Sequence, residues 1–571
     1  MQLFKNQPGW THVFGQNYPL VRHSSVVHSF ARKPIHPSKG KCSWRRIRPG
    51  LRRLFLEFCS NTTIHGWRNI EAAKSLLERA WWTIVLAMSV FGCAVLIQNV
   101  YHKWDQHPVI VSFDDTPTSV WSIPFPAITV CPEAKIRMEV MNFTDDFYTY
   151  FHSNESLSEM RQDQLMAVLQ ICDEFFHRFE AYQEKYPNNS LDVVKFFRKL
   201  SVRMDKTIIW CRQGGKLCAE DFTHTLTEEG ICFTYNGLSQ EDMFNDGVLH
   251  DEYRYLTETK SAMNWTLEDG YAPDTPFLTH PKRGTGYANR FRMNLASYNS
   301  DVEAHCVEEQ GFKVVLHSPD EYPLPFAKYV LLSLDRDINV AIRPEIMVTA
   351  SELATYSPIR RQCYFSHERE LKFFRAYNQN NCELECLTNF TLARCGCVKF
   401  SMPRSAGTRI CSTAEQKCIM EAHYNMLKVL SESRMNNKLI VSACSCMSAC
   451  SSIHYLTEVT QSTYDYIETI GLRLNPLKPD AVKRLENMET SKISIYFKGA
   501  EFIGSRRNEI FGLTDFIANC GGILGLCLGA SFVSLVELLY YCVARPLQLV
   551  KKSTGRKRKV VIVQEKGYER Y

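Results

Sequence analysis

The sequence predicts an α+β membrane protein in which two transmembrane helices bracket a large, disulfide-rich domain. Three observations predict this fold class. Two long apolar segments lie near opposite ends of the 571-residue chain. Sixteen of its 22 cysteines fall between them, from Cys131 to Cys450. Strand-like stretches directly follow the first apolar segment and directly precede the second, so we expect one sheet to join both membrane helices.

Residues 1–80 form a basic N-terminal region that we expect in the cytosol. Its segment 32–53 holds nine Lys or Arg and no Asp or Glu, and a second basic run, KKSTGRKRK, lies in the C-terminal tail of residues 546–571. Positive charge gathers on the cytosolic side of membrane spans, so both termini are expected there. No nucleic-acid partner is expected, because no other feature of the sequence supports one.

The first transmembrane helix is expected at residues 81–101. Its sequence, WWTIVLAMSVFGCAVLIQNV, lies in an uncharged stretch between Arg79 and Lys103. About 20 such residues cross the hydrocarbon core of a bilayer. The segment begins too far into the chain to be a cleaved signal peptide. Aromatic residues suited to the membrane interfaces flank it, namely Trp81, Trp82, Tyr101 and Trp104.

An extracellular domain is expected at residues 102–511. Its even number of cysteines predicts a disulfide framework in an oxidising compartment. The CGC and CSC pairs raise zinc as an alternative, but zinc ligands are usually spaced C-x₂₋₄-C, so no metal is expected. Asn61 also carries an N-glycosylation motif but would lie inside. Five such motifs support the extracellular location, at Asn142, Asn154, Asn188, Asn264 and Asn389.

Strand and helix patterns alternate along this domain. Strands are expected at 108–113, 125–131, 329–350 and 492–503, and helices at 164–179, 190–200, 367–387 and 413–433. The apolar stripes of the helices indicate core packing. The run HEREL departs from the metalloprotease motif H-E-x-x-H, and no nucleophile–base pair is evident, so the chain is not expected to be an enzyme and needs no cofactor.

The second transmembrane helix is expected at residues 512–545. Its uncharged run, continued past Glu537 to Ala544, would measure ~43 Å as a straight helix, whereas the hydrocarbon core is ~30 Å thick. Strong tilt or a break is therefore expected. Glycines let helices approach closely and let the chain bend. The segment has four, at Gly521, Gly522, Gly525 and Gly529.

Several motifs occur in a fixed order along the chain. The pair His65–Gly66 in NTTIHGWRNI precedes the first span, and IPFPAITVCPE follows it. WCRQGGKLCAEDF, TEEGICFTYN, RQCYFSHERELKFFRAYNQNNCELEC and CGCVKFSMPR come next, and GLCLGAS lies in the second span. By these motifs the chain resembles the degenerin/epithelial sodium channel (amiloride-sensitive sodium channel) family, most closely its insect pickpocket branch, from about residue 60 to 546.

The resemblance implies a trimeric channel whose extracellular domain has a β-sheet palm and a helical finger and thumb. Cys172 and Cys306 are left over from the family's pairs, and we expect them to pair with each other. The implied disulfides are Cys131–Cys232, Cys211–Cys218, Cys363–Cys450, Cys382–Cys446, Cys386–Cys444, Cys395–Cys418 and Cys397–Cys411.

The resemblance also implies roles in the second span. Gly529, Ala530 and Ser531 match the family's selectivity filter, where an extended backbone aims carbonyl oxygens at the lumen. Without that context these residues would be read as a small-residue packing seam. Glu537 matches a family glutamate that would form a cation-attracting ring in three copies. The alternative is a glutamate that snorkels to the inner interface.

Two further pairs match gating positions of the family. His65 and Gly66 correspond to a re-entrant loop beneath the filter. Ala518 and Asn519 fall at the degenerin gate position, where small residues let the three spans close. Acid-sensing relatives carry an aspartate in place of Asn519 and a tryptophan near Cys363. Both departures disfavour gating by protons.

The implied function is that of a subunit of an amiloride-sensitive, sodium-selective cation channel, a multi-pass plasma-membrane protein gated by an extracellular chemical or mechanical stimulus in sensory transduction. Expected partners are sodium ions, membrane lipid, related subunits in a homo- or heterotrimer, and an extracellular ligand as one candidate stimulus. The alternative is a disulfide-rich cell-surface receptor or adhesion protein anchored by two spans. That alternative accounts for the cysteines and glycans but not for the GAS motif, Glu537 or the His-Gly pair.

Overall fold

The computed structural model describes residues 44–106, 109–153, 155–172, 192–248, 265–276, 280–303, 305–325, 328–435, 444–471 and 487–548. The chain divides into two compact units, one of residues 1–93 with 524–571 and one of residues 94–523. Two helices, α3 (Leu76–Gln106) and α17 (Leu513–Leu528), run from one unit into the other.

The unit of residues 1–93 and 524–571 is helical. The segment Leu76–Asp105 is long and apolar enough to cross a membrane, and Leu513–Leu528 with Phe532–Gln548 meet the same criteria as a pair bent by 78°. Along α3, Met88 and Phe91 are 69% and 72% exposed, which suits lipid rather than a protein core. Among its described residues, this unit also has the helices α1 (Trp44–Asn61), α2 (Trp67–Ala72), α18 (Phe532–Leu539) and the π-helix η7 (Tyr540–Ala544).

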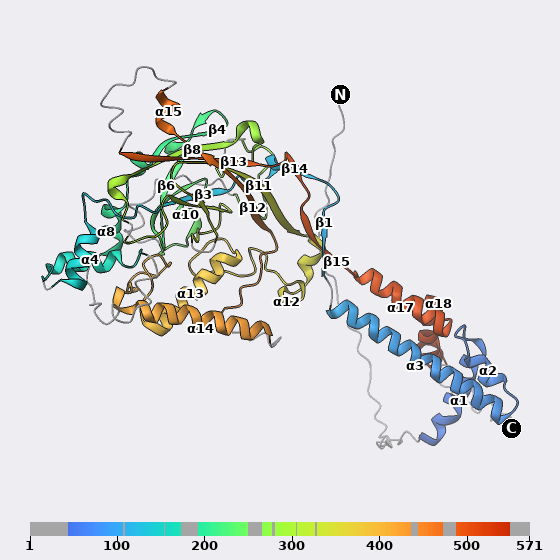
Figure 1. Cartoon of the computed structure of the whole chain (residues 1–571). Helices are drawn as coiled ribbons and strands as arrows, with labels where there is room; N and C mark the ends of the chain where they lie inside the picture. The colour runs from blue at the N-terminus through green and yellow to red at the C-terminus, as the bar shows by residue number, and fades with distance from the viewer. Residues whose placement is uncertain are drawn as a thin grey trace, which may run out of the picture. The chain divides into compact units, whose positions relative to one another are not determined.

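The unit of residues 94–523 is built on an eight-stranded sheet (Figure 1). The strand order is β1-β15-β11-β13-β8-β4-β5, and β12 also pairs with β11. The longest strand, β11, pairs in parallel with β13 and β15 and antiparallel with β12. The strands are β1 (Val109–Phe113), β4 (Ile208–Gln213), β5 (Lys216–Leu217), β8 (Phe291–Tyr298), β11 (Arg336–Thr349), β12 (Ser452–Thr463), β13 (Met488–Phe497) and β15 (Ser505–Glu509).

Strands β1 and β15 connect this sheet to the two long apolar helices. β1 follows α3 and β15 precedes α17, and the two strands pair antiparallel from Val109 opposite Glu509 to Phe113 opposite Ser505. The prediction that one sheet joins both apolar segments is therefore confirmed.

A second sheet of five strands has the order β10-β9-β3-β7-β6. Side chains of both sheets form one buried apolar cluster that includes Phe125, Tyr235, Phe291 and Ile495. Burying each such side chain stabilises the fold by about 1.5–3 kcal/mol. The strands are β3 (Ala127–Pro132), β6 (Phe222–Thr227), β7 (Gly230–Tyr235), β9 (Phe312–His317) and β10 (Val330–Leu332), and β2 (Thr118–Ser119) pairs separately with β14 (Glu501–Phe502).

Helices of this unit form two groups. α4 (Phe143–His152), α5 (Glu159–Val168) and α8 (Val193–Leu200) share a second apolar cluster. The pair α13 (Gln379–Cys395) and α14 (Gln416–Met435) lie side by side (Figure 1). The short helices are η1 (Val120–Ser122), α9 (Met204–Thr207), η2 (Ala219–Asp221), α10 (Gln240–Met243), η3 (Tyr287–Asn289), η4 (Asn299–Asp301), η5 (Ser351–Thr355), α12 (Pro358–Arg361), η6 (Thr413–Glu415) and α15 (Tyr466–Gly471).

Two of the expected helices are shorter than predicted. The helix expected at 164–179 ends at Val168, and residues 173–179 lie outside the described part of the chain. The prediction of helix across 367–378 is wrong, because α13 begins only at Gln379. There the amide of Asn245 donates to the carbonyl oxygens of Leu371 and Phe374, so tertiary hydrogen bonds replace helical ones.

Eight disulfides cross-link the unit of residues 94–523, and each is expected to contribute about 2–4 kcal/mol. They are the seven pairs that the resemblance implies and the remaining pair Cys172–Cys306. Cys397 and Cys411 lie near Glu415 as in a metal site, but their sulfurs are bonded to each other and offer no thiolate.

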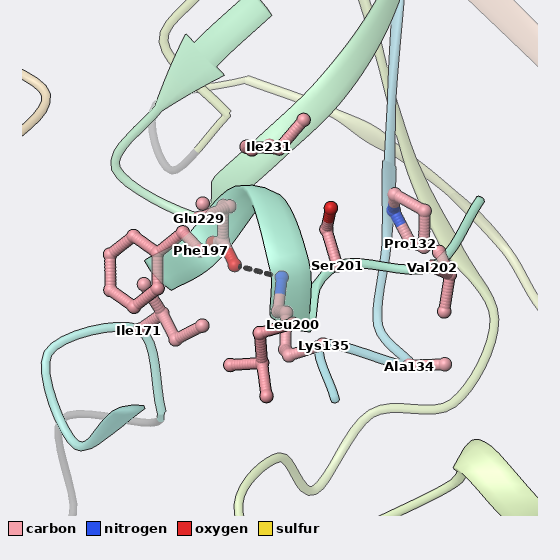
Figure 2. Close-up of a pocket in the computed structure, with 11 residues that line it drawn as sticks. Pro132, Ala134, Lys135, Ile171, Phe197, Leu200, Ser201, Val202, Glu229 and Ile231 are labelled. Atoms are coloured by element: carbon pink, nitrogen blue, oxygen red, sulfur yellow. Dashed lines mark hydrogen bonds and ion pairs between the residues drawn. The ribbon is translucent and has the colours of Figure 1, made fainter. Parts of the chain in front are cut away.

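A buried charge cluster lies beside the β6–β7 hairpin (Figure 2). Figure 2 shows the Lys135 ammonium facing Glu229, at 2.5 Å from one of its carboxylate oxygens. The Lys313 ammonium lies 2.9 Å from the other oxygen of Glu229. Burial alone would raise the pKa of Glu229, but the two ammonium groups outweigh it and lower that pKa to about 2. The adjoining cavity measures only about 10 Å³, room for one water at most, so the cluster is structural.

Two of the five predicted glycosylation sites, Asn142 and Asn389, lie among the described residues. The Asn142 side-chain oxygen caps α4 by accepting from the Asp145 N–H at 3.1 Å, and Asn389 is exposed on α13. Asn154, Asn188 and Asn264 lie outside the described residues.

Candidate functional site

The bent segment contains a three-residue break between α17 and α18. Gly529 has φ +61°, in the left-handed region that favours glycine, and Ser531 is extended at φ −115° and ψ 176°. Ser531 then caps α18, because its hydroxyl accepts from the Ser534 N–H at 3.4 Å and its own N–H donates to the Ser534 hydroxyl at 3.0 Å. The break thus lies at Gly529–Ser531, where the sequence analysis expects it.

The loop between α1 and α2 packs directly against this break. The His65 N–H donates to the carbonyl of Leu528 at 2.8 Å. A Cβ added to Gly529 would lie 2.4 Å from the His65 imidazole, so no larger residue fits there without movement. Gly66 follows at φ +90°, and this left-handed turn starts α2. The structure therefore brings together the two motifs that the resemblance assigns to filter and gating loop.

Glu537 makes its contacts with the same loop. One of its carboxylate oxygens accepts hydrogen bonds from the Thr63 N–H at 3.0 Å and from the hydroxyls of Thr63 and Thr62 at 3.2 and 3.4 Å. The Thr63 hydroxyl also lies 2.7 Å from that of Ser534. Within one chain Glu537 therefore braces the loop against α18. Its role in a cation ring stays a prediction.

Sequence reasoning missed Thr62, Thr63 and Ser534. A signal for Ser534 was present, because Ser531, Ser534 and Glu537 recur every three residues and so share one face of α18. No sequence signal paired that face with the threonines, which lie more than 470 positions earlier in the chain.

A second set of contacts ties α1 to the end of this segment. Arg545 donates to a Glu57 oxygen at 2.5 Å, and the rings of Phe58 and Tyr541 meet edge to face at 5.6 Å. Phe58 also contacts Trp67 of α2 at 6.2 Å. The helix before the loop is therefore anchored to η7 as well as to the break.

The two residues that the resemblance assigns to the gate, Ala518 and Asn519, lie on an exposed face of α17. Ala518 and Asn519 are exposed, and the Asn519 amide donates to the Asp515 carbonyl at 2.8 Å. A Cβ added to Gly521 or Gly522 would meet no atom of the described residues within 4 Å. This glycine face is therefore free to receive another helix.

Arg360 contacts the outer end of α3 within the unit of residues 94–523. Its guanidinium lies 4.2 Å from the centre of the Trp104 ring and 4.5 Å from that of Tyr356, and it donates to the Trp104 carbonyl at 2.8 Å. The Trp104 ring also meets Phe516 of α17 at 5.3 Å. Acid-sensing relatives have a tryptophan near the position of Cys363, whereas this chain has Arg360 close to Cys363, and Arg360 binds Trp104 of α3.

Comparison with known proteins accounts for the order of these motifs. The sequence model of the family described as "Amiloride-sensitive sodium channel" matches residues 58–541, a range that includes the loop, the disulfides and the break. Pickpocket protein 28 of Drosophila melanogaster is 26% identical over 87% of this chain and 80% of the relative.

Two other relatives align over a similar extent. The sodium channel protein Nach of Drosophila melanogaster is 20% identical over 86% of this chain and 87% of its own. Human acid-sensing ion channel 2 is 22% identical over 85% of each chain. The chain therefore belongs to the amiloride-sensitive sodium channel family, the degenerin/epithelial sodium channels, and to its pickpocket branch.

Proposed function

We propose that this chain is a subunit of a trimeric, sodium-selective, amiloride-sensitive cation channel of the plasma membrane. Family membership supports a sodium channel subunit rather than an enzyme. The observation that carries the finer proposal is the break at Gly529–Ser531, braced by His65. In this proposal the break is the selectivity filter and the loop at His65 and Gly66 supports it.

In this proposal the break provides backbone carbonyl oxygens that can bind a cation. Among the described residues, no hydrogen bond reaches the carbonyl oxygens of Gly529 and Ala530. Such oxygens at membrane depth require water, an ion or a protein donor. In three copies around an axis they form rings that replace part of the hydration shell of a small monovalent cation. Glu537 would add negative charge below these rings.

The open face of α17 supports assembly into a trimer. Two spans of one chain cannot enclose a pore, whereas second spans arranged in a ring can. Gly521 and Gly522 leave room for close approach of neighbouring helices, and Ala518 would narrow the closed path. The spans are 81–101 and 512–545. Residues 102–511 face outside, where an extracellular chemical or mechanical stimulus acts, and both termini are cytosolic.

Recording from oocytes tests this function. The chain is expressed alone and with related subunits, in wild type and with Ala518→Phe to hold the gate open. Inward current that falls on sodium replacement and on addition of amiloride is expected, and Ser531→Ala should weaken the preference for sodium over potassium. Surface protein that carries no current in any combination would instead support an anchored receptor.

A further inference from the structure

A cavity of about 380 Å³ lies in the unit of residues 94–523. Residues of β11, β12 and β15 form its floor, and the turn after β9 and the start of α13 form its wall. Cavities of this size hold small organic molecules. None of the residues discussed as filter, gate or loop lines it.

Strand pairing places the polar floor of this cavity on one face of the large sheet. Residues Ser505 and Arg507 of β15 lie opposite Met347 and Thr349 of β11, and on the other side Ser505 lies opposite Phe113 of β1. Side chains at alternate positions of a strand share a face, so these residues point the same way. Arg507 is thus fixed at the cavity by its strand rather than by a loop.

The guanidinium of Arg507 is half-buried and has no carboxylate partner. Its one hydrogen bond to a described residue goes to the Gln362 carbonyl, at 3.3 Å. Burial lowers the pKa of this guanidinium, because the charge loses contact with water and no carboxylate of a described residue compensates for that loss. A guanidinium has five N–H donors, so four remain for another acceptor. Arg343, also at the cavity, makes no ion pair with a described residue.

Two of the three acidic groups at the cavity, Glu321 and Asp320, already have hydrogen-bond partners. The Glu321 carboxylate accepts from the Ser318 N–H at 3.2 Å and from the Asn380 amide at 3.2 Å, and Asp320 accepts from the Ser318 hydroxyl. Burial and the neighbouring Asp320 raise the pKa of Glu321 to about 8, so much of it is neutral at pH 7. Glu345 lies directly opposite His454 across the β11–β12 pair.

Apolar side chains complete the lining. Phe113 and Ile503 are 77% and 60% exposed although they lie at the cavity, and Leu267, Ile346 and Met347 add further apolar surface. A ligand here would therefore meet apolar side chains, among them Phe113 and Met347, together with the unpaired guanidinium of Arg507.

We propose that this cavity binds a small organic carboxylate with an aromatic or aliphatic body, whose carboxylate pairs with Arg507 and whose body covers Phe113 and Ile503. A charge-assisted, two-pronged hydrogen bond is the strongest interaction a guanidinium offers, and carboxylate geometry matches it. This inference concerns only the binding of a ligand in the cavity, so its test does not depend on whether the protein conducts ions.

Photolabelling of the purified, full-length assembly tests the proposal. The probe is 4-benzoylbenzoate, a photoreactive aromatic carboxylate, and the neutral control is 4-benzoylbenzamide. Mass spectrometry should find carboxylate label on peptides that contain Phe113, Met347 or Ile503, and the amide should label them about tenfold less, the factor that 1.4 kcal/mol represents.

Variants of two neighbouring arginines test whether Arg507 itself binds the carboxylate. Arg507→Gln should reduce the label about tenfold, and Arg506→Gln should not, because Arg506 lies next in the strand on the opposite face, 3.8 Å from Asp114. Ser505→Tyr leaves the charge of Arg507 in place but fills the cavity, so it should also reduce the label. This variant replaces Arg507→Gln in the test if Arg507→Gln fails to assemble.

Three results would overturn the proposal. One is equal labelling by the acid and the amide. Another is label on these peptides that survives both Arg507→Gln and Ser505→Tyr. The third is the absence of label in wild type, which would indicate that a carboxylate of a neighbouring subunit occupies Arg507 in the assembly.

Discussion

The imidazole of His65 occupies the space that any side chain on Gly529 would need. A Cβ there would stand 2.4 Å from the ring, and the His65 N–H binds the Leu528 carbonyl one residue before the break. The loop before the first span therefore supports the break in the second span through shape as well as through a hydrogen bond.

Gly529→Ala is expected to abolish conduction. The left-handed backbone at Gly529 disfavours alanine by about 1–2 kcal/mol, and the added methyl group collides with His65. Surface protein and whole-cell current are measured together. Gly92→Ala in α3 is the matched control, because a Cβ there meets no atom within 4 Å. Normal sodium selectivity in Gly529→Ala would contradict the contact with His65.

Thr63 and Glu537 are expected to be energetically coupled. Thr63→Val removes one hydroxyl donor to the carboxylate, and Glu537→Gln removes the charge that strengthens this bond. A hydrogen bond to a charged group contributes about 1.5–3 kcal/mol, so the double variant should lose about 1 kcal/mol less than the sum of the single variants. Thermal unfolding of the purified protein measures this. Strict additivity would show that the carboxylate points elsewhere, for instance into the pore.

Ala518→Phe is expected to raise the resting current severalfold. Ala518 lies on the open face of α17, where a phenyl ring would keep neighbouring helices apart. Resting current per surface channel, measured with and without amiloride, gives the result. A surface-expressed variant with the wild-type current would contradict the placement of the gate at this position.

Arg360 and Trp104 are expected to stabilise each other by about 1 kcal/mol, the range of a partly desolvated cation–π contact. A double-mutant cycle of Arg360→Gln and Trp104→Leu, followed by thermal unfolding, isolates this energy. Arg290→Gln is the control, since Arg290 stacks on the exposed ring of Tyr287 at 4.5 Å. We expect Arg360→Gln but not Arg290→Gln to lower stability and alter gating. If Arg360→Gln and Arg290→Gln changed stability and gating equally, the contact of Arg360 with Trp104 would have no special role.

Acid should destabilise the protein through His317. Burial lowers the pKa of this histidine from its ordinary 6.5 to about 4. The Ser318 carbonyl accepts from His317 Nδ1 at 2.9 Å, so in the neutral ring Nε2 accepts from the Thr129 hydroxyl at 2.9 Å. Between these two pH values the unfolded chain binds a proton that the folded chain does not, so stability falls as pH drops from about 6.5 to about 4, by on the order of 3 kcal/mol in total.

Unfolding followed at several pH values checks this expectation. His317→Gln should flatten the slope in this window, and His305→Gln should leave it unchanged, because His305 is exposed. An unaltered slope in His317→Gln would show that another group carries the acid sensitivity.

Local sequence patterns predicted much of the fold. Most of the stretch 329–350 became the long central strand β11, but its start, Val330–Leu332, forms the separate strand β10 of the second sheet, because the chain turns at Asp335 with φ +53°. The stripe in 190–200 became α8, because its apolar face is buried. The run 367–378 has helical spacing too, yet Asn245 takes its carbonyl oxygens. A hydrogen bond from a residue more than 120 positions away leaves no trace in the local pattern.

In the candidate site, too, local features could be predicted from the sequence and contacts between distant residues could not. The break at Gly529–Ser531 follows from glycine and segment length, both local properties. The partners of Glu537 and of Trp104 do not, since Thr63 and Arg360 lie in segments hundreds of residues away and are polar types common on any surface. Family resemblance identified the His-Gly pair but not the threonines beside it.

Chemical modification at position 531 tests most directly whether the break lines the sodium path. A channel with Ala518→Phe and Ser531→Cys is treated from outside with a charged methanethiosulfonate reagent while sodium current is recorded, and Ala518→Phe alone controls for Cys520 and Cys527. The account predicts irreversible loss of most of the current in the double variant only. Current that survives complete labelling of the new cysteine would show that sodium passes by another route.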